Sequence, residues 1–220
     1  MVEEAIAEPA ANLVKEGLEL GYCARPGQVD VRLAARGSKA APLVQAAEVI
    51  VRDRLGRHIF AEEDEELEAV LIGMLTARKQ TLALAESCTG GAIAHRLTNV
   101  PGASAALLAG LVTYSNEAKK LFLGVSADTL KQHGAVSKPV AREMAEGAAR
   151  QTGADYALSV TGIAGPSGGS LEKPVGTVFI GLAAKDGTTV LKNLNPYDRE
   201  TFKQVTAQQA MELLRRKLLG

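Results

Sequence analysis

The sequence predicts a three-layer α/β/α domain with a mixed sheet over residues 67–220, preceded by a small α+β domain over residues 1–66. In the larger part, apolar strand-like runs alternate with helix-like stretches, which is typical of parallel strands covered by helices. The dipeptide Asp186-Gly187 lies between two such runs and indicates a hairpin. A hairpin adds antiparallel strands, and the sheet is therefore expected to be mixed.

The first 66 residues read as helices around one strand. Residues 3–20 have a helical pattern that ends at Gly21, a residue suited to a helix C-terminus. Residues 29–33 alternate apolar and polar, which predicts a half-buried strand. A second helix over 40–55 is expected to stop at Gly56, and the acidic run 62–66 to begin a helix that reaches about residue 77.

The larger part has a regular succession of elements. Its expected strands are 81–86, 107–114, 156–160, 176–184 and 188–194. Its expected helices are 90–98, 117–123, 138–152 and a last one from Asp198 or Thr201 to about residue 219. Asn116 and Ser137 have side chains suited to cap the second and third of these helices.

Composition excludes several classes of protein. Lys+Arg and Asp+Glu are both 25, and this balance gives no whole-chain case for binding nucleic acid or an anionic membrane. No apolar run approaches the ~18 residues of a spanning helix, and there is no signal-peptide core. Cys23 and Cys88 cannot form a disulfide scaffold, and three dispersed histidines form no spaced ligand pair. We therefore expect a cytoplasmic protein without metal or cofactor.

Polar loops follow three of the predicted strands. If these strands are parallel neighbours, their carboxyl ends share one edge of the sheet and the loops meet at one pocket. The loop residues are Ser87, Thr89, Gly90 and Gly91 after the first strand, Tyr114, Ser115, Asn116 and Lys119 after the second, and Thr161, Gly162 and Gly165 after the third.

Ser87 is a candidate nucleophile in this pocket. A serine hydroxyl needs a base, and the available bases are Lys119 alone or a Tyr114–Lys119 pair. Lysine acts as a base only where desolvation or nearby positive charge lowers its pKa. The alternatives are a capping or turn role for Ser87 and a buried, packing role for the neighbouring Cys88.

Two further features could hold an anion. The glycine-rich segment 161–170 has the composition of a phosphate loop but lacks the Gly-Lys-Ser/Thr of a nucleotide-binding P-loop, and a plain surface loop is the alternative. Arg199 begins the last helix, where a guanidinium suits a phosphate or carboxylate; the alternative is a surface ion pair with Asp198.

Several separated blocks resemble the CinA C-terminal family, which contains the bacterial nicotinamide mononucleotide deamidases. The blocks are Ala85-Glu86-Ser87-Cys88-Thr89-Gly90-Gly91, Val112-Thr113-Tyr114-Ser115-Asn116-Glu117-Ala118-Lys119, His133-Gly134-Ala135-Val136-Ser137, Thr161-Gly162-Ile163-Ala164-Gly165-Pro166 and Lys173-Pro174-Val175-Gly176-Thr177-Val178. The resemblance covers roughly residues 67–219. Residues 1–66 resemble the KH-like segment that precedes this domain in full-length CinA proteins.

The resemblance implies an amidohydrolase that converts nicotinamide mononucleotide to nicotinate mononucleotide and ammonia in pyridine-nucleotide recycling. It implies no metal, no cofactor, and a homodimer or higher homo-oligomer. The implied catalytic residues are Ser87, Tyr114 and Lys119, with Ser87 attacking the amide carbon or activating the attacking water. The implied substrate-binding residues are Thr89, Gly90, Gly91, Asn116, Thr161, Gly162, Gly165 and Arg199.

A second hypothesis belongs to another class of function. The chain could be a non-catalytic nucleotide-binding or interaction module of a competence-damage-inducible CinA protein. The joint presence of Ser87, Tyr114 and Lys119 favours the enzyme, because a pure binder needs no base beside a hydroxyl. ADP-ribose hydrolysis is not expected, because the larger N-terminal domain linked to it in full-length CinA proteins is not part of this sequence.

Overall fold

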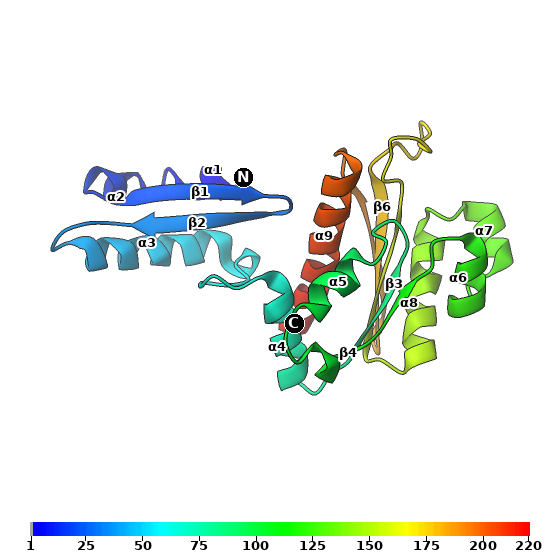
Figure 1. The fold of residues 1–220 in the computed structure, drawn as a ribbon. Coiled ribbons are helices and arrows are strands. Elements are labelled where there is room, and N and C mark those ends of the chain that lie inside the picture. The colour runs from blue at the N-terminus through cyan, green and yellow to red at the C-terminus, as the bar shows by residue number, and fades with distance from the viewer. Residues whose placement is uncertain (1) are drawn as a thin grey trace. The chain divides into compact units, whose positions relative to one another are not determined.

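The computed structural model describes residues 2–220 and divides into two compact units, residues 1–64 and residues 65–220 (Figure 1). The sequence had suggested a division after residue 66, within the same linking segment. Every helix within residues 2–220 is too short or too polar to span a bilayer.

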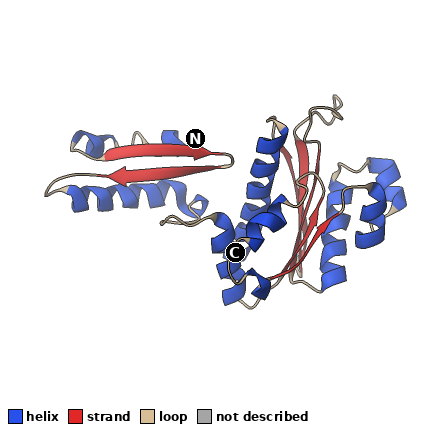
Figure 2. Cartoon of the chain, viewed as in Figure 1, coloured by secondary structure: helices blue, strands red, loops and turns tan. Residues whose placement is uncertain are grey.

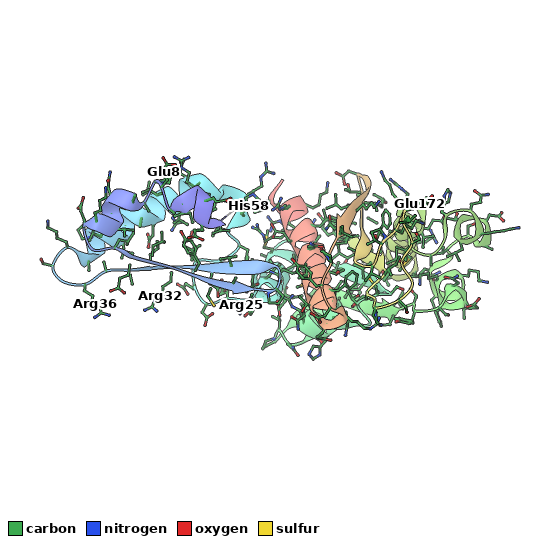
Figure 3. The ribbon with its side chains drawn as sticks, turned by 90° about the horizontal axis from the view of Figure 1, so that it is seen from above. Glu8, Arg25, Arg32, Arg36, His58 and Glu172 are labelled. Carbon is green, nitrogen blue, oxygen red and sulfur yellow. The ribbon has the colours of Figure 1, made fainter. Side chains whose placement is uncertain are left out.

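The smaller unit is a two-stranded antiparallel sheet with helices on one side. Its elements are α1 (Val2–Ile6), α2 (Ala11–Lys15), β1 (Glu19–Arg25), β2 (Gln28–Ala34), α3 (Ala40–Leu55) and the 3₁₀ turn η1 (Gly56–His58). Ile6, Leu43 and Ala47 are buried between the helices and the strands. Arg25 and Arg32 project from the side of the hairpin that no helix covers (Figure 3).

The predicted helix over 3–20 is wrong, because this stretch holds two short helices and the start of the strand β1. Helix α2 ends where Gly17 takes a φ of +110° and the Leu18 N–H reaches back to the Leu13 carbonyl, a glycine-terminated helix end. Strand β1 follows and pairs with β2 along its full length. This pairing is not visible in the helical pattern of residues 3–20 taken alone. The KH-like interpretation of this unit stays a prediction.

The larger unit has a central sheet between two layers of helices. Its elements are α4 (Leu67–Ala77), β3 (Leu82–Glu86), α5 (Ala92–Thr98), the 3₁₀ turn η2 (Ala103–Ala105), β4 (Leu107–Val112), α6 (Asn116–Leu123), α7 (Ala127–His133), α8 (Lys138–Thr152), β5 (Tyr156–Gly162), β6 (Thr177–Ala184), β7 (Gly187–Leu194) and α9 (Arg199–Leu219).

The sheet confirms the predicted mixed α/β architecture. Its strand order is β4-β3-β5-β6-β7. Strands β4, β3 and β5 are parallel to one another, whereas β6 and β7 continue the sheet as the expected antiparallel hairpin. Helices α4, α5 and α9 cover one face, and α6, α7 and α8 lie on the other (Figures 1 and 2).

Several element ends differ from the prediction for local reasons. Ser115, not Asn116, caps α6, because its hydroxyl accepts a hydrogen bond from the Ala118 N–H. Helix α5 begins at Ala92 rather than at residue 90, because Gly90 and Gly91 both have positive φ. Asp198 is the residue that opens α9, and α7 was not predicted at all.

Helix α8 packs at the centre of its layer and holds α6 close to the sheet. Val140, Met144 and Ala148 of α8 are buried in one apolar cluster with Leu123, the last residue of α6. Gly147 permits the close approach of the two helices, since a Cβ there would lie 2.0 Å from the Leu123 carbonyl oxygen. The position of α6 over the sheet edge is therefore set by close packing.

Candidate active site at the carboxyl edge of the sheet

Three neighbouring parallel strands end at one edge, and their next residues form a row. Glu86 of β3 is in register with Val112 of β4 and with Val160 of β5. One residue further on, the Ser87 N–H donates to the Val160 carbonyl and the Thr113 N–H donates to the Glu86 carbonyl. Ser87 is therefore flanked by Thr113 on one side and Thr161 on the other.

The three hydroxyl side chains of this row belong to the α8 face of the sheet. Ala85, two residues before Ser87, is buried in the apolar cluster with α8, and Leu111, two residues before Thr113, packs against the same cluster. Side chains alternate between faces along a strand, so the hydroxyls that follow continue on that face. Thr161 fits this pattern, since its hydroxyl donates to the Ala135 carbonyl just before α8.

Lys119 of α6 enters the same face and contacts Ser87. Its Nζ lies 3.0 Å from the Ser87 Oγ, 2.8 Å from the Thr113 carbonyl oxygen and 3.4 Å from the Tyr114 carbonyl oxygen. The side chain is among the largest fully buried ones, with 1% exposure. A lysine and a serine that are 32 positions apart in sequence thus form a buried pair.

Burial lowers the pKa of the Lys119 ammonium, and the nearby Cys88 thiol opposes the shift only in part. No carboxylate of residues 2–220 forms an ion pair with Lys119, so its charge lacks the partner that buried cations usually have. Lys119 also lies in the first turn of α6, where the positive end of the helix dipole disfavours a cation. Burial, the lack of a counter-ion and the helix dipole therefore all make Lys119 lose its proton more readily than an exposed lysine.

Cys88 is adjacent to Ser87 but is not prepared for nucleophilic attack. Burial raises the pKa of its thiol to about 12. Only the thiolate is a strong nucleophile, and at neutral pH almost none forms. Cys88 therefore fits the packing role that the sequence offered as its alternative.

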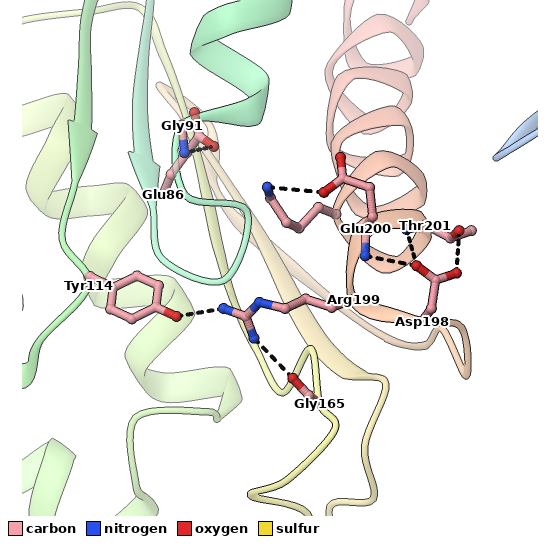
Figure 4. Close-up of polar contacts among 9 residues, drawn as sticks. Glu86, Gly91, Tyr114, Gly165, Asp198, Arg199, Glu200 and Thr201 are labelled. Atoms are coloured by element: carbon pink, nitrogen blue, oxygen red, sulfur yellow. Dashed lines mark hydrogen bonds and ion pairs between the residues drawn. The ribbon is translucent and has the colours of Figure 1, made fainter.

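Glu86 organises the turn between β3 and α5. Its buried carboxylate accepts hydrogen bonds from the Thr89 hydroxyl (2.7 Å) and from the N–H groups of Gly91 (3.0 Å), Ile93 (3.2 Å) and Ala94 (2.8 Å) (Figure 4). Carboxylates at a helix N-terminus satisfy the free N–H groups of its first turn. Glu86 thus has a structural role that leaves little acceptor capacity for a substrate.

The hydrogen-bond donors of the predicted anion-binding turn are therefore largely used by acceptors within the turn itself. The Thr89 hydroxyl and the Gly91 N–H bond to Glu86, and the Gly90 N–H donates to the Ser87 carbonyl. These three residues shape the turn that presents Ser87. They lie beside Ser87, but each of these three donors already has an acceptor within the turn.

Gly162, at the end of β5, offers a backbone donor on the other side of Ser87. The Ile163 N–H donates to the Thr177 carbonyl of the antiparallel neighbour. Bonded and non-bonded residues alternate along such a ladder, so the Gly162 N–H points the opposite way, towards β3. The chain of β3 turns towards α5 after Ser87, so the Gly162 N–H faces the turn that carries Ser87.

The Tyr114 hydroxyl and the Arg199 guanidinium meet at the exposed side of the site. Arg199 donates through Nη2 to the Tyr114 hydroxyl (2.8 Å) and through Nη1 to the Gly165 carbonyl (3.0 Å) (Figure 4). Tyr114 thus meets Lys119 through its backbone carbonyl, while its phenol contacts Arg199. Asn116 is exposed at the start of α6, next to this loop.

The described residues contain no group of three or more His, Cys, Asp or Glu side chains arranged to hold a metal ion. The sequence reasoning missed Thr113 as a site residue and Ser115 as the cap of α6. Ser115 had a usable signal, since serine before a helical stretch is a common cap. Thr113 had none, because its place beside Ser87 depends on the register between strands.

A family model described as the CinA C-terminal domain matches residues 64–218. The chain belongs to this family. A CinA-like protein from Citrifermentans bemidjiense is 47% identical over 221 residues, which cover 100% of this chain and 53% of that protein. The chain spans about half the length of the curated relatives it matches.

Solved structures of CinA proteins have a similar fold. The crystal structure of competence/damage inducible protein CihA from Agrobacterium tumefaciens is 42% identical with a TM-score of 0.66, and the match covers 74% of this chain and 99% of that one. A competence-damaged protein (CinA) superfamily protein from Escherichia coli is 33% identical with a TM-score of 0.67, over 74% of this chain and 98% of that one.

Proposed function

We propose that residues 65–220 form an amidohydrolase that converts nicotinamide mononucleotide to nicotinate mononucleotide and ammonia. The observation that carries this proposal is the buried Ser87–Lys119 pair, with 3.0 Å between Oγ and Nζ. The substrate class comes from the resemblance to the CinA deamidases, and the reaction class from the geometry of the pair.

Lys119 acts as the general base. A neutral amine has two N–H donors and one lone pair, and two of its three neighbours are carbonyl oxygens, which can only accept. The two N–H groups therefore go to Thr113 and Tyr114, and the lone pair faces Ser87. In this arrangement the Ser87 O–H donates to Nζ, which is the geometry that proton removal requires.

Ser87 attacks the carboxamide carbon as its proton passes to Lys119. The carbonyl π electrons move to the oxygen, and we assign to the Gly162 N–H the stabilisation of that developing negative charge. The Lys119 ammonium then returns its proton to the amide nitrogen as the C–N bond breaks, which releases ammonia and leaves an ester on Ser87. Water, deprotonated by the neutral Lys119, attacks the ester carbon, and Lys119 then returns that proton to the departing Ser87 oxygen. The product acid ionises to the carboxylate, which leaves Ser87 and Lys119 in their starting forms.

Arg199 holds the phosphate of the mononucleotide. Two of its five N–H donors contact Tyr114 and Gly165, which fix the guanidinium beside the site and leave others for an anion. Arg199 is also the first residue of α9, where the helix dipole favours a negative group. Tyr114 positions Arg199 through its phenol, and it supports Lys119 through its carbonyl.

The test is ammonia release from nicotinamide mononucleotide by the chain and by Ser87→Ala. Ser87→Ala is expected to reduce turnover to background, while Cys88→Ala, one residue away, retains it. Turnover that persists unchanged in Ser87→Ala would overturn the role of Ser87. A folded wild-type chain that binds the nucleotide without releasing ammonia would instead support the non-catalytic binding module.

A further inference from the structure

The Thr113 side chain is a buried polar group that the mechanism above does not use. Its Oγ1 is among the few buried side-chain oxygens or nitrogens of residues 2–220 that have no hydrogen-bond partner, and Thr113 is 1% exposed. Leaving a hydroxyl buried and unpaired is energetically unfavourable, because the group loses its hydrogen bonds to water and gains none in the protein. A buried unpaired group in a native protein calls for a functional explanation.

The position of this hydroxyl points to Lys119. Thr113 is the strand neighbour of Ser87, its side chain belongs to the face from which Lys119 enters, and its own carbonyl is 2.8 Å from the Lys119 Nζ. Rotation about the Cα–Cβ bond of a threonine moves the hydroxyl relative to the carbonyl of the same residue. A change of rotamer can therefore bring the Thr113 hydroxyl towards Nζ without movement of the backbone.

The need for another acceptor arises during the reaction. Protonated Lys119 has three N–H donors, and the three oxygens around its Nζ are the Thr113 carbonyl, the Ser87 Oγ and, at 3.4 Å, the Tyr114 carbonyl. Once Ser87 Oγ is bonded to the substrate carbon, it is no longer a hydroxyl and accepts hydrogen bonds poorly. Lys119 is protonated at that same moment and is shielded from water.

We propose that Thr113 is a positioning residue of the Ser87–Lys119 pair, whose hydroxyl accepts the third N–H of the Lys119 ammonium while Ser87 carries the tetrahedral intermediate, until that proton passes to the amide nitrogen. This inference rests on the proposed function. The hydroxyl is unpaired at rest because its partner forms only after proton transfer.

The first test compares Thr113→Val with Thr113→Ser in the full chain. Valine keeps the shape and removes the hydroxyl, and kcat is expected to fall roughly 10- to 100-fold, since hydrogen bonds to charged groups have that effect on rate. Thr113→Ser is expected to restore most of kcat. The melting temperature of Thr113→Val should stay equal or rise, because no resting hydrogen bond is lost; a purely structural role predicts the opposite.

The second test does not depend on turnover. The Ser87→Ala variant removes the competing acceptor, so the pKa of Lys119, followed by the NMR shift of its side chain, then depends on Thr113. Adding Thr113→Val to Ser87→Ala should lower this pKa, and adding Thr113→Ser should not. If the wild-type chain releases no ammonia, the proposed function fails while this measurement still decides the role of Thr113.

Two results would overturn the inference. One is a Thr113→Val protein with wild-type kcat, and the other is an unchanged Lys119 pKa when Thr113→Val is added to Ser87→Ala. If the valine variant does not fold, the same comparisons between Thr113→Ala and Thr113→Ser give the answer, since serine alone retains the hydroxyl.

Discussion

Glu86 and Lys119 are ionisable side chains buried at the same end of β3, on opposite faces of the sheet, and their surroundings differ. Glu86 accepts four hydrogen bonds from the turn and from the start of α5. Lys119 meets two carbonyls and one hydroxyl and has no carboxylate. The Glu86 carboxylate is fully used in holding the fold, whereas the Lys119 side chain has no counter-ion and is available for proton transfer.

Replacing Lys119 should produce the largest effect and tests one half of this comparison. Lys119→Met keeps the length of the side chain and removes the base, so turnover of nicotinamide mononucleotide should fall by roughly 10²–10⁴-fold. The melting temperature at neutral pH should rise, because an apolar group avoids the cost of burying an amine. Lys120→Met is the matched control, since Lys120 is the exposed neighbour. Retained turnover in Lys119→Met contradicts the general-base role.

Glu86→Ala tests the other half, and its effect should fall on stability. Four donors lose their common acceptor, and even partial loss of their hydrogen bonding should cost at least about 3 kcal/mol of unfolding free energy. Urea denaturation followed by circular dichroism measures it. Glu86→Gln, which keeps one acceptor oxygen, should lie between wild type and Glu86→Ala. A near-wild-type unfolding free energy for Glu86→Ala removes the distinction between the two faces.

The pH dependence of kcat/KM sharpens the comparison, because only Lys119 is expected to titrate in a catalytically relevant way. Below the Lys119 pKa, kcat/KM should decline about tenfold per pH unit. Because the pKa of Lys119 is lowered, kcat/KM should be constant above that pKa, and this plateau should be reached before pH 10.5, the ordinary value for lysine. The same shift makes the unfolded chain bind more protons, so stability should increase with pH up to that value. A flat kcat/KM from pH 5 to 9 would falsify the neutral-amine mechanism.

Arg199 should give the smallest effect, on binding rather than on chemistry. Arg199→Ala removes the guanidinium between Tyr114 and Gly165 and should raise KM for nicotinamide mononucleotide roughly tenfold while kcat changes little. Arg142→Ala is a suitable control, since Arg142 forms an exposed pair with Glu146 on α8. If the nicotinamide riboside without phosphate suffers the same loss as the mononucleotide, Arg199 does not bind the phosphate.

Local sequence signals predicted the larger unit well and the smaller unit less well. The alternation of strands and helices after residue 67 and the hairpin at Asp186-Gly187 both correspond to elements of the structure. The prediction for the smaller unit failed at β1, because it placed the end of a helix at Gly21, whereas Gly17 ends α2 and the chain from Glu19 pairs with β2. Asn116 was preferred as a cap over Ser115, although either side chain can accept from the helix N-terminus.

The sequence by itself determined which chemical groups are available: a serine in a glycine-rich turn, a lysine in the helix after a strand, and an arginine at the start of the last helix. Those choices are local, so turn chemistry, helix caps and apolar periodicity reveal them. Only the tertiary structure decided that Ser87 is flanked by Thr113, that the Tyr114 phenol contacts Arg199, and that Glu86 and Lys119 are separated by the sheet. Register and side-chain parity between strands that are distant in sequence arise from packing, and no single stretch of sequence encodes them.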